Sequence, residues 1–144
     1  MSGDGSVRIE RLIAAPPSAV FETLLNPDAM RHWLAPHHFR VLDLDMTARE
    51  GGTYRAVIGE EADNGIVTGC FEKLVPGRHV RISWCWPDID TDDVSHVDMH
   101  LSVVSPGTLL ALTHDNHRSE EQRQARSRAW ASCIGKLSDW LARQ

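Results

Sequence analysis

The sequence predicts an α+β fold in which a long C-terminal helix closes a curved antiparallel sheet. Three observations predict it. Most of the chain between residues 39 and 114 alternates apolar and polar side chains, which is typical of half-buried strands. Two short helical patterns precede this stretch, and a much longer one follows it. One helix of that length can bury its apolar stripe only against the apolar face of the sheet.

Size and composition fit one domain over residues 1–144. The chain has 144 residues, with 42% apolar and 24% charged side chains, which is the globular range. The net charge of −5 and the scattered basic residues argue against a nucleic-acid partner. No apolar stretch reaches the roughly 18 residues of a membrane span, and no signal-peptide pattern opens the chain. We therefore expect a cytoplasmic protein with no membrane partner.

The first forty residues predict one strand and two short helices. Residues 7–14 alternate in polarity as a strand does, although imperfectly. Pro16 and the proline after it suit the first turn of a helix, which Pro27 ends. We expect Asp28 to cap a second short helix and Pro36 to end it.

The middle of the chain predicts a meander of antiparallel strands. A hairpin over residues 39–58 turns at two adjacent glycines, Gly51 and Gly52. Further strands are expected at residues 66–75, 78–86, 94–104 and 108–114. Turn residues separate them, including the triplet at 63–65 and an acidic loop at 87–93. The acidic loop lacks the glycine and terminal glutamate of a calcium loop, which favours a solvated hairpin tip.

The last element is predicted to be one amphipathic helix. Ser119, with Gln122 three residues later, forms a capping box. At about 24 residues and about 1.5 Å each, the helix would reach roughly 36 Å, enough to cross a six- or seven-stranded sheet. Its apolar residues recur at helical spacing: Ala129, Trp130, Cys133, Ile134, Leu137, Trp140 and Leu141.

Several short stretches, in this order, resemble a known family. They are IAAPP (13–17), VF (20–21), NP (26–27), WLAP (33–36), REGGTY (49–54), GCFE (69–72), ISW (82–84), GT (107–108), LTH (112–114), Trp130 and Leu137. The chain resembles the activator of Hsp90 ATPase homologue-like family of the START-like, Bet v 1-like (SRPBCC) superfamily. Ala129 stands before Trp130, where family members often carry glycine. The resemblance implies a helix-grip fold from about residue 7 to residue 141.

In such a fold, alternate strand residues face the helix and could line a ligand cavity. The side chains predicted to bind a ligand are Trp33, Tyr54, Trp84, Trp86, Met99, His114, Trp130 and Ile134. The alternative is that the same residues form an ordinary core. Tyr54 and His114 have the stronger claim, because an inward phenol or imidazole requires a hydrogen-bond partner, which either a ligand or the protein can supply.

No pattern of metal ligands or catalytic residues stands out. Two of the eight histidines, His96 and His100, would lie about 13 Å apart along one strand, too far to share an ion. His114 and His117 lack further ligands. No hydrolase, kinase or dehydrogenase motif is present, so we predict no catalytic residues, no metal and no cofactor. A cyclase or lyase using His114 or Tyr54 as its acid or base is an alternative.

The first functional hypothesis is a non-enzymatic protein that binds a small apolar or amphipathic molecule between helix and sheet. The alternative from the resemblance is a protein-interaction or co-chaperone-like role, and a second copy of the chain is a further candidate partner. The three cysteines, Cys70, Cys85 and Cys133, are too widely spaced for a disulfide framework and are expected to be reduced.

Overall fold

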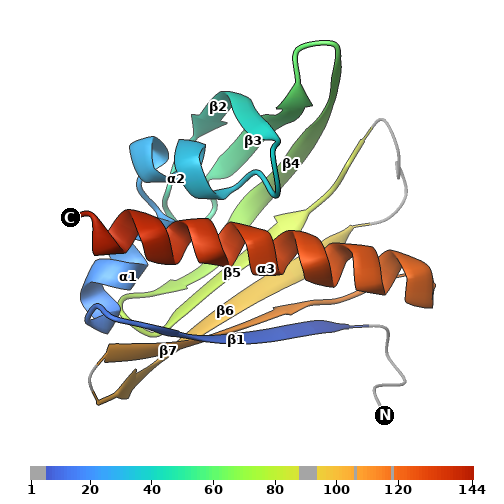
Figure 1. The fold of residues 1–144 in the computed structure, drawn as a ribbon. Helices are drawn as coiled ribbons and strands as arrows, with labels where there is room; N and C mark the ends of the chain where they lie inside the picture. Colours follow the sequence, from blue (N-terminus) through green and yellow to red (C-terminus); the bar gives the residue numbers. More distant parts are fainter. Residues whose placement is uncertain (1–5, 88–93, 106, 118) are drawn as a thin grey trace.

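The computed structural model describes residues 6–87, 94–105, 107–117 and 119–144, so residues 88–93 of the acidic loop lie outside the described residues. It contains a seven-stranded antiparallel sheet in the order β1-β7-β6-β5-β4-β3-β2. A long helix, α3, crosses one face of this sheet (Figure 1). The elements are β1 (Val7–Ile13), α1 (Pro17–Leu24), α2 (Pro27–Trp33), β2 (Arg40–Met46), β3 (Thr53–Glu60), β4 (Asp63–Val75), β5 (His79–Trp84), β6 (Ser95–Val104), β7 (Gly107–His114) and α3 (Glu120–Ala142). The predicted α+β helix-grip fold is confirmed.

The cap of α2 differs from the prediction. Asn26, not Asp28, is the capping residue, and its side-chain oxygen accepts hydrogen bonds from the backbone N–H groups of Asp28 at 2.8 Å and Ala29 at 3.3 Å. Pro27 takes the first helical position, where its missing N–H costs nothing, so the cap must precede it. Asp28 lies in the first turn instead, where its charge suits the helix dipole.

The turn between β3 and β4 also differs from the prediction. Residues 63–65 were expected to form a turn, but they begin β4: Glu60 pairs with Asp63, and Ile58 pairs with Gly65. The glycine serves packing instead, because a Cβ added at Gly65 would lie 3.2 Å from the ring of Trp86. The glycine therefore marks a close approach between the backbone of β4 and the Trp86 side chain.

The terminal helix begins as predicted. The Ser119 side chain accepts a hydrogen bond from the Gln122 backbone N–H at 3.0 Å. The buried stripe of the helix consists of Trp130, Cys133, Ile134 and Leu137. All three cysteines are free. No described helix is both long enough and apolar enough to cross a membrane.

Contacts with α2 fix the C-terminal half of α3. The Cys133 thiol donates to the Leu34 carbonyl at 3.2 Å, and the Lys136 ammonium donates to the Ala35 carbonyl at 2.6 Å. Both carbonyls lie just after α2, where the helix leaves backbone acceptors unused. These bonds hold α2 and the loop after it beside residues 133–136 of α3.

Candidate functional site

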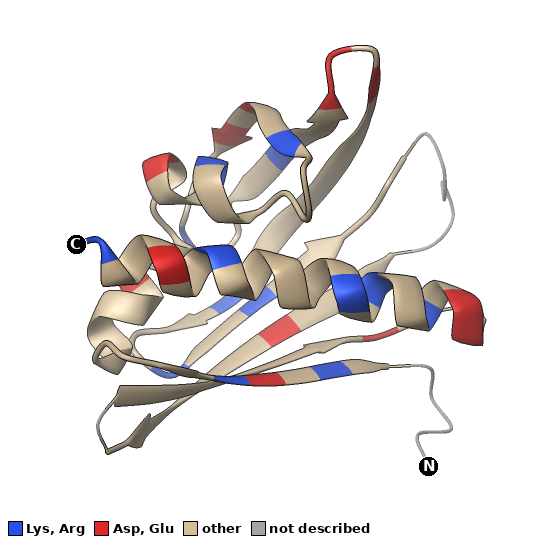
Figure 2. Ribbon diagram, viewed as in Figure 1, with Lys and Arg blue, Asp and Glu red and all other residues tan. Residues whose placement is uncertain are grey.

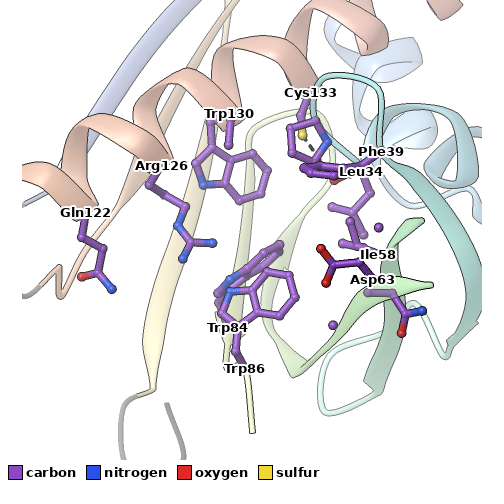
Figure 3. Close-up of a pocket in the computed structure, with 15 residues that line it drawn as sticks. Leu34, Phe39, Ile58, Asp63, Trp84, Trp86, Gln122, Arg126, Trp130 and Cys133 are labelled. Carbon is purple, nitrogen blue, oxygen red and sulfur yellow. Dashed lines mark hydrogen bonds between the residues drawn. The ribbon is translucent and has the colours of Figure 1, made fainter. Parts of the chain in front are cut away.

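A cleft of about 430 Å³ opens between the N-terminal half of α3 and the sheet. This volume lies within the usual range for small-molecule sites. Its walls come from α3, the loop after α2, the β3–β4 hairpin and the end of β5 (Figure 3). The lining residues are Leu34, Pro36, Phe39, Ile58, Gly59, Asp63, Asn64, Gly65, Trp84, Trp86, Gln122, Arg126, Ala129, Trp130 and Cys133.

Three tryptophans form the aromatic wall of the cleft. Trp84 lies between the other two, with its ring centroid 5.8 Å from that of Trp86 and 5.1 Å from that of Trp130. The rings of Trp84 and Trp86 meet edge to face at 78°, an arrangement that the aromatic quadrupole favours. Trp84 and Trp86 are two residues apart along an extended chain, so strand alternation points both to the same face.

Polar side chains surround the mouth of the cleft. The Arg126 guanidinium lies over the Trp86 ring, 5.8 Å from its centroid, within the range of a cation–π contact. Gln122 lies one helical turn before Arg126, and Figure 2 shows basic residues along this half of α3. Asp63 of the hairpin lies across the cleft from Arg126 (Figure 3), and its neighbour Asn64 also lines the cleft. The cleft is thus apolar inside and polar at its mouth.

Two indole N–H groups of the wall lack a hydrogen-bond partner. Among the described residues, the buried side-chain polar atoms without a partner are the Nε1 atoms of Trp33, Trp84 and Trp86. A buried donor left unpaired costs about 1–3 kcal/mol. A molecule in the cleft that brought an acceptor to Trp84 or Trp86 would remove part of that cost.

The structure separates the eight side chains predicted to bind a ligand. Trp84, Trp86 and Trp130 line the cleft. Trp33, Tyr54 and Met99 instead line an internal void of about 10 Å³, no larger than one water molecule, which Trp84 also borders. His114 and Ile134 are buried and line neither space. Ligand binding by any of the eight stays a prediction.

Sequence reasoning missed the polar mouth. Gln122, Arg126 and Trp130 follow each other at intervals of four, so they share one face of α3. That spacing is visible in the sequence. The prediction of ligand-binding side chains, however, includes only Trp130 and Ile134 from this helix. The contributions of Asp63 and Asn64 depended on the hairpin, which the sequence placed incorrectly.

Tyr54 meets its hydrogen-bond requirement inside the protein. Its hydroxyl donates to the Ser83 carbonyl at 2.5 Å. Burial raises the pKa of the phenol far above its ordinary value, so the group keeps its proton. The ring lies against Gly69, where an added Cβ would come within 2.6 Å of it. Tyr54 is therefore held in the core and does not reach the cleft.

His114 is also satisfied internally, and it supports the aromatic wall from behind. Its Nδ1 accepts a hydrogen bond from the Trp130 indole N–H at 2.9 Å, and its Nε2 lies 2.7 Å from the Ser95 hydroxyl oxygen. Burial, together with the nearby charge of Arg126, lowers the pKa of His114 well below its ordinary value. The ring is therefore neutral with its proton on Nε2, which donates to Ser95. The Ser95 hydroxyl in turn donates to the Trp84 carbonyl at 3.2 Å.

Comparison with known families identifies the chain. The family described as "Activator of Hsp90 ATPase homolog 1-like protein" matches residues 14–142, nearly the whole chain. The protein belongs to this family. The resemblance inferred from the short sequence stretches is thereby confirmed. No curated protein matches the chain.

Several solved structures share the fold of the chain. Protein CV1439 from Chromobacterium violaceum has a TM-score of 0.84 at 23% identity, covering 94% of this chain and 96% of its own. The AHSA1 protein from Silicibacter pomeroyi has a TM-score of 0.82 at 25% identity, covering 95% and 97%. CalU16 from Micromonospora echinospora has a TM-score of 0.70 at 23% identity, covering 94% and 73%. At these identities the likeness establishes the fold.

Proposed function

We propose that this protein binds a small amphipathic molecule in the cleft between α3 and the sheet. The observation that carries the proposal is the three-tryptophan wall below a mouth that contains Arg126 and Gln122. The family's helix-grip fold supports a ligand-binding role in general. The cleft supplies the particular chemistry of this chain.

The apolar body of the ligand would lie against Trp84, Trp86 and Trp130. Burial of apolar surface contributes about 25 cal/mol per Å², so a ligand that covers all three rings gains most of its affinity there. Its polar group would remain at the mouth, where the Arg126 guanidinium favours an anionic or strongly accepting group. An acceptor near the Trp84 or Trp86 indole would add direction.

The proposal can be tested with two fluorescent probes of similar shape. 1-Anilinonaphthalene-8-sulfonate is aromatic and anionic, and N-phenyl-1-naphthylamine is its neutral relative. We expect both to bind the wild-type protein with enhanced fluorescence. We also expect Trp86→Ala to weaken the affinity for both probes by about tenfold or more, because each probe loses a large aromatic contact.

Trp140→Ala is the matched control for the Trp86 variant. Trp140 lies near the other end of α3, where its ring stacks on His32 at 4.6 Å, outside the cleft. Its replacement should leave the affinity for both probes unchanged. Equal binding by the wild type and Trp86→Ala, or no binding by the wild type, would overturn the proposal.

Native mass spectrometry of the purified protein addresses the natural ligand and the alternative role together. A retained small molecule that Trp86→Ala loses would support the cleft as its site. A protein that carries no ligand and binds neither probe would instead favour the interaction role expected from the family description. The same spectra give the subunit number, which tests the expected homodimer.

A further inference from the structure

A second cluster of functional side chains lies on the face of the sheet opposite α3. In the β5–β6 pairing, His79 stands directly across from His100, and Asp98 lies two residues before His100 on the same face. The ligand-type atoms of these three side chains all lie within 4.8 Å of one another. Over the described parts of the chain, no other group of three or more histidines, cysteines and acidic residues meets this criterion.

We propose that His79, Asp98 and His100 bind a divalent transition-metal ion of the zinc and copper type. Two imidazole nitrogens and one carboxylate oxygen form the donor set that such ions take in proteins. Three protein ligands leave at least one coordination position for water. His79 and Asp98 are largely buried, with 16% of each side chain exposed, whereas His100 is exposed to solvent and gives the ion access.

The observed geometry needs only a small adjustment to hold an ion. The His79 Nε2 and Asp98 Oδ1 atoms are 2.7 Å apart, and the two imidazole rings stack with their centroids 4.1 Å apart. An ion about 2.0–2.1 Å from each donor requires donors no more than about 4.2 Å apart. Rotation of the exposed His100 ring can bring its nitrogen within that distance. The ion would replace the proton that His79 now shares with Asp98.

Outer contacts hold the carboxylate in the orientation that the site requires. The Arg81 guanidinium donates to Asp98 Oδ2 at 2.9 Å and to Glu72 Oε1 at 3.2 Å. The second carboxylate oxygen is thus occupied while Oδ1 remains directed at His79. Ligating carboxylates in metal sites are commonly hydrogen-bonded in this way. Arg8 and Lys73 also act on His100 as positive charges, so we expect moderate rather than extreme affinity.

Along one strand, His96 and His100 are too far apart to share an ion, as the sequence indicates. The proposed site instead combines Asp98 and His100, two residues apart on β6, with His79 of β5. This arrangement depends on the register of the β5–β6 pair, in which His79 opposes His100. The cluster is on the opposite face of the sheet from the tryptophan cleft, so the metal proposal and the ligand proposal can be tested independently of each other.

The test is calorimetric titration of the metal-free, full-length protein with zinc chloride and, separately, copper chloride. We expect one equivalent of each ion to bind the wild type. His100→Ala, which removes an exposed ligand, should weaken binding by about tenfold or more. Asp98→Asn should weaken it as well, and circular dichroism would verify that each variant is folded.

His96→Ala is the matched control. His96 lies on the same strand and the same face as His100, but its ring pairs with Glu72 and Asp115 at 3.4 Å and 3.6 Å. Its replacement should leave zinc affinity unchanged. Absence of zinc binding to the wild type would overturn the proposal. Equal binding by the wild type and by folded His100→Ala would also overturn it, because the ion would then bind other histidines such as His37 and His38.

Discussion

The two halves of α3 cross the same sheet but differ in what lies beneath them. In the C-terminal half, Ile134 and Leu137 are fully buried, and side chains of the helix bond the backbone after α2. In the N-terminal half, Gln122 and Arg126 stand over a cleft of about 430 Å³. Trp130 marks the boundary, because it lines the cleft and also donates to buried His114.

The difference between the two halves has two sources, the side chains of the helix itself and the elements that pack against it. The buried apolar residues of α3 run from Trp130 to Leu137, whereas residues 120–128 are almost all charged or polar. The neighbours differ: α2 and the loop after it press against residues 133–140, whereas the hairpin residues Asp63 and Asn64 form only the far rim of the cleft. One helix thus acts as a plug at one end and as a lid at the other.

Leu137→Ala tests whether the plug half is independent of the cleft. Removal of a fully buried leucine leaves a cavity, so we expect a loss of about 2–5 kcal/mol in the free energy of unfolding. Urea denaturation measures this loss. The affinity for both naphthalene probes should stay unchanged at a temperature where the variant is folded. A parallel loss of probe binding would mean that the two halves behave as one unit.

Acid should destabilise the support behind the cleft wall. His114 has a lowered pKa in the folded protein, so below about pH 6.5 the unfolded chain binds one more proton than the folded chain. The contribution of neutral His114 to the free energy of unfolding is therefore fully present above that pH. It is lost as the pH drops, by up to about 1.4 kcal/mol per pH unit. Arg126, His117 and His96 lower the pKa further through their charges.

Urea denaturation at several pH values between 5.5 and 7.5 measures this slope. His114→Gln should reduce the slope, because the residue no longer takes up a proton on unfolding. His38→Ala is the control variant, because it removes an exposed histidine that contacts Glu60 and Phe39 at the surface, and it should leave the slope unchanged. An undiminished slope in a folded His114→Gln variant would contradict the assignment.

Features set by neighbours in the chain could be predicted from the sequence, and features set by distant contacts could not. The Ser119 cap and the inward alternation of Trp84 and Trp86 follow from local spacing and are present in the structure. The sequence around Gly65 predicts a turn, whereas the role of this glycine depends on contact with Trp86, which is distant in sequence. His79 meets His100 only through the register of two strands.

The candidate site followed the same division. Aromatic side chains on the correct strand face could be named, but the sequence did not separate Tyr54, which bonds Ser83 in the core, from Trp86, which lines the cleft. Strand alternation points both of these side chains toward the helix. The difference arises from which part of α3 lies above each residue, and that depends on the packing of α2.

Arg126→Gln isolates the polar mouth from the aromatic wall. Arg126 is only half-buried, so the change in unfolding free energy should stay within about 0.5 kcal/mol. Loss of the guanidinium should weaken anionic 1-anilinonaphthalene-8-sulfonate by about tenfold, or about 1.4 kcal/mol, and leave neutral N-phenyl-1-naphthylamine unaffected.

Arg128→Gln removes the same charge two residues further along α3, at an exposed position that does not line the cleft. A general electrostatic effect of the basic helix would weaken the anionic probe equally in both variants. A specific contact at the mouth would weaken it only in Arg126→Gln. If the neutral probe were lost together with the anionic one, Arg126 would act by holding the Trp86 ring in place rather than by binding the charged group.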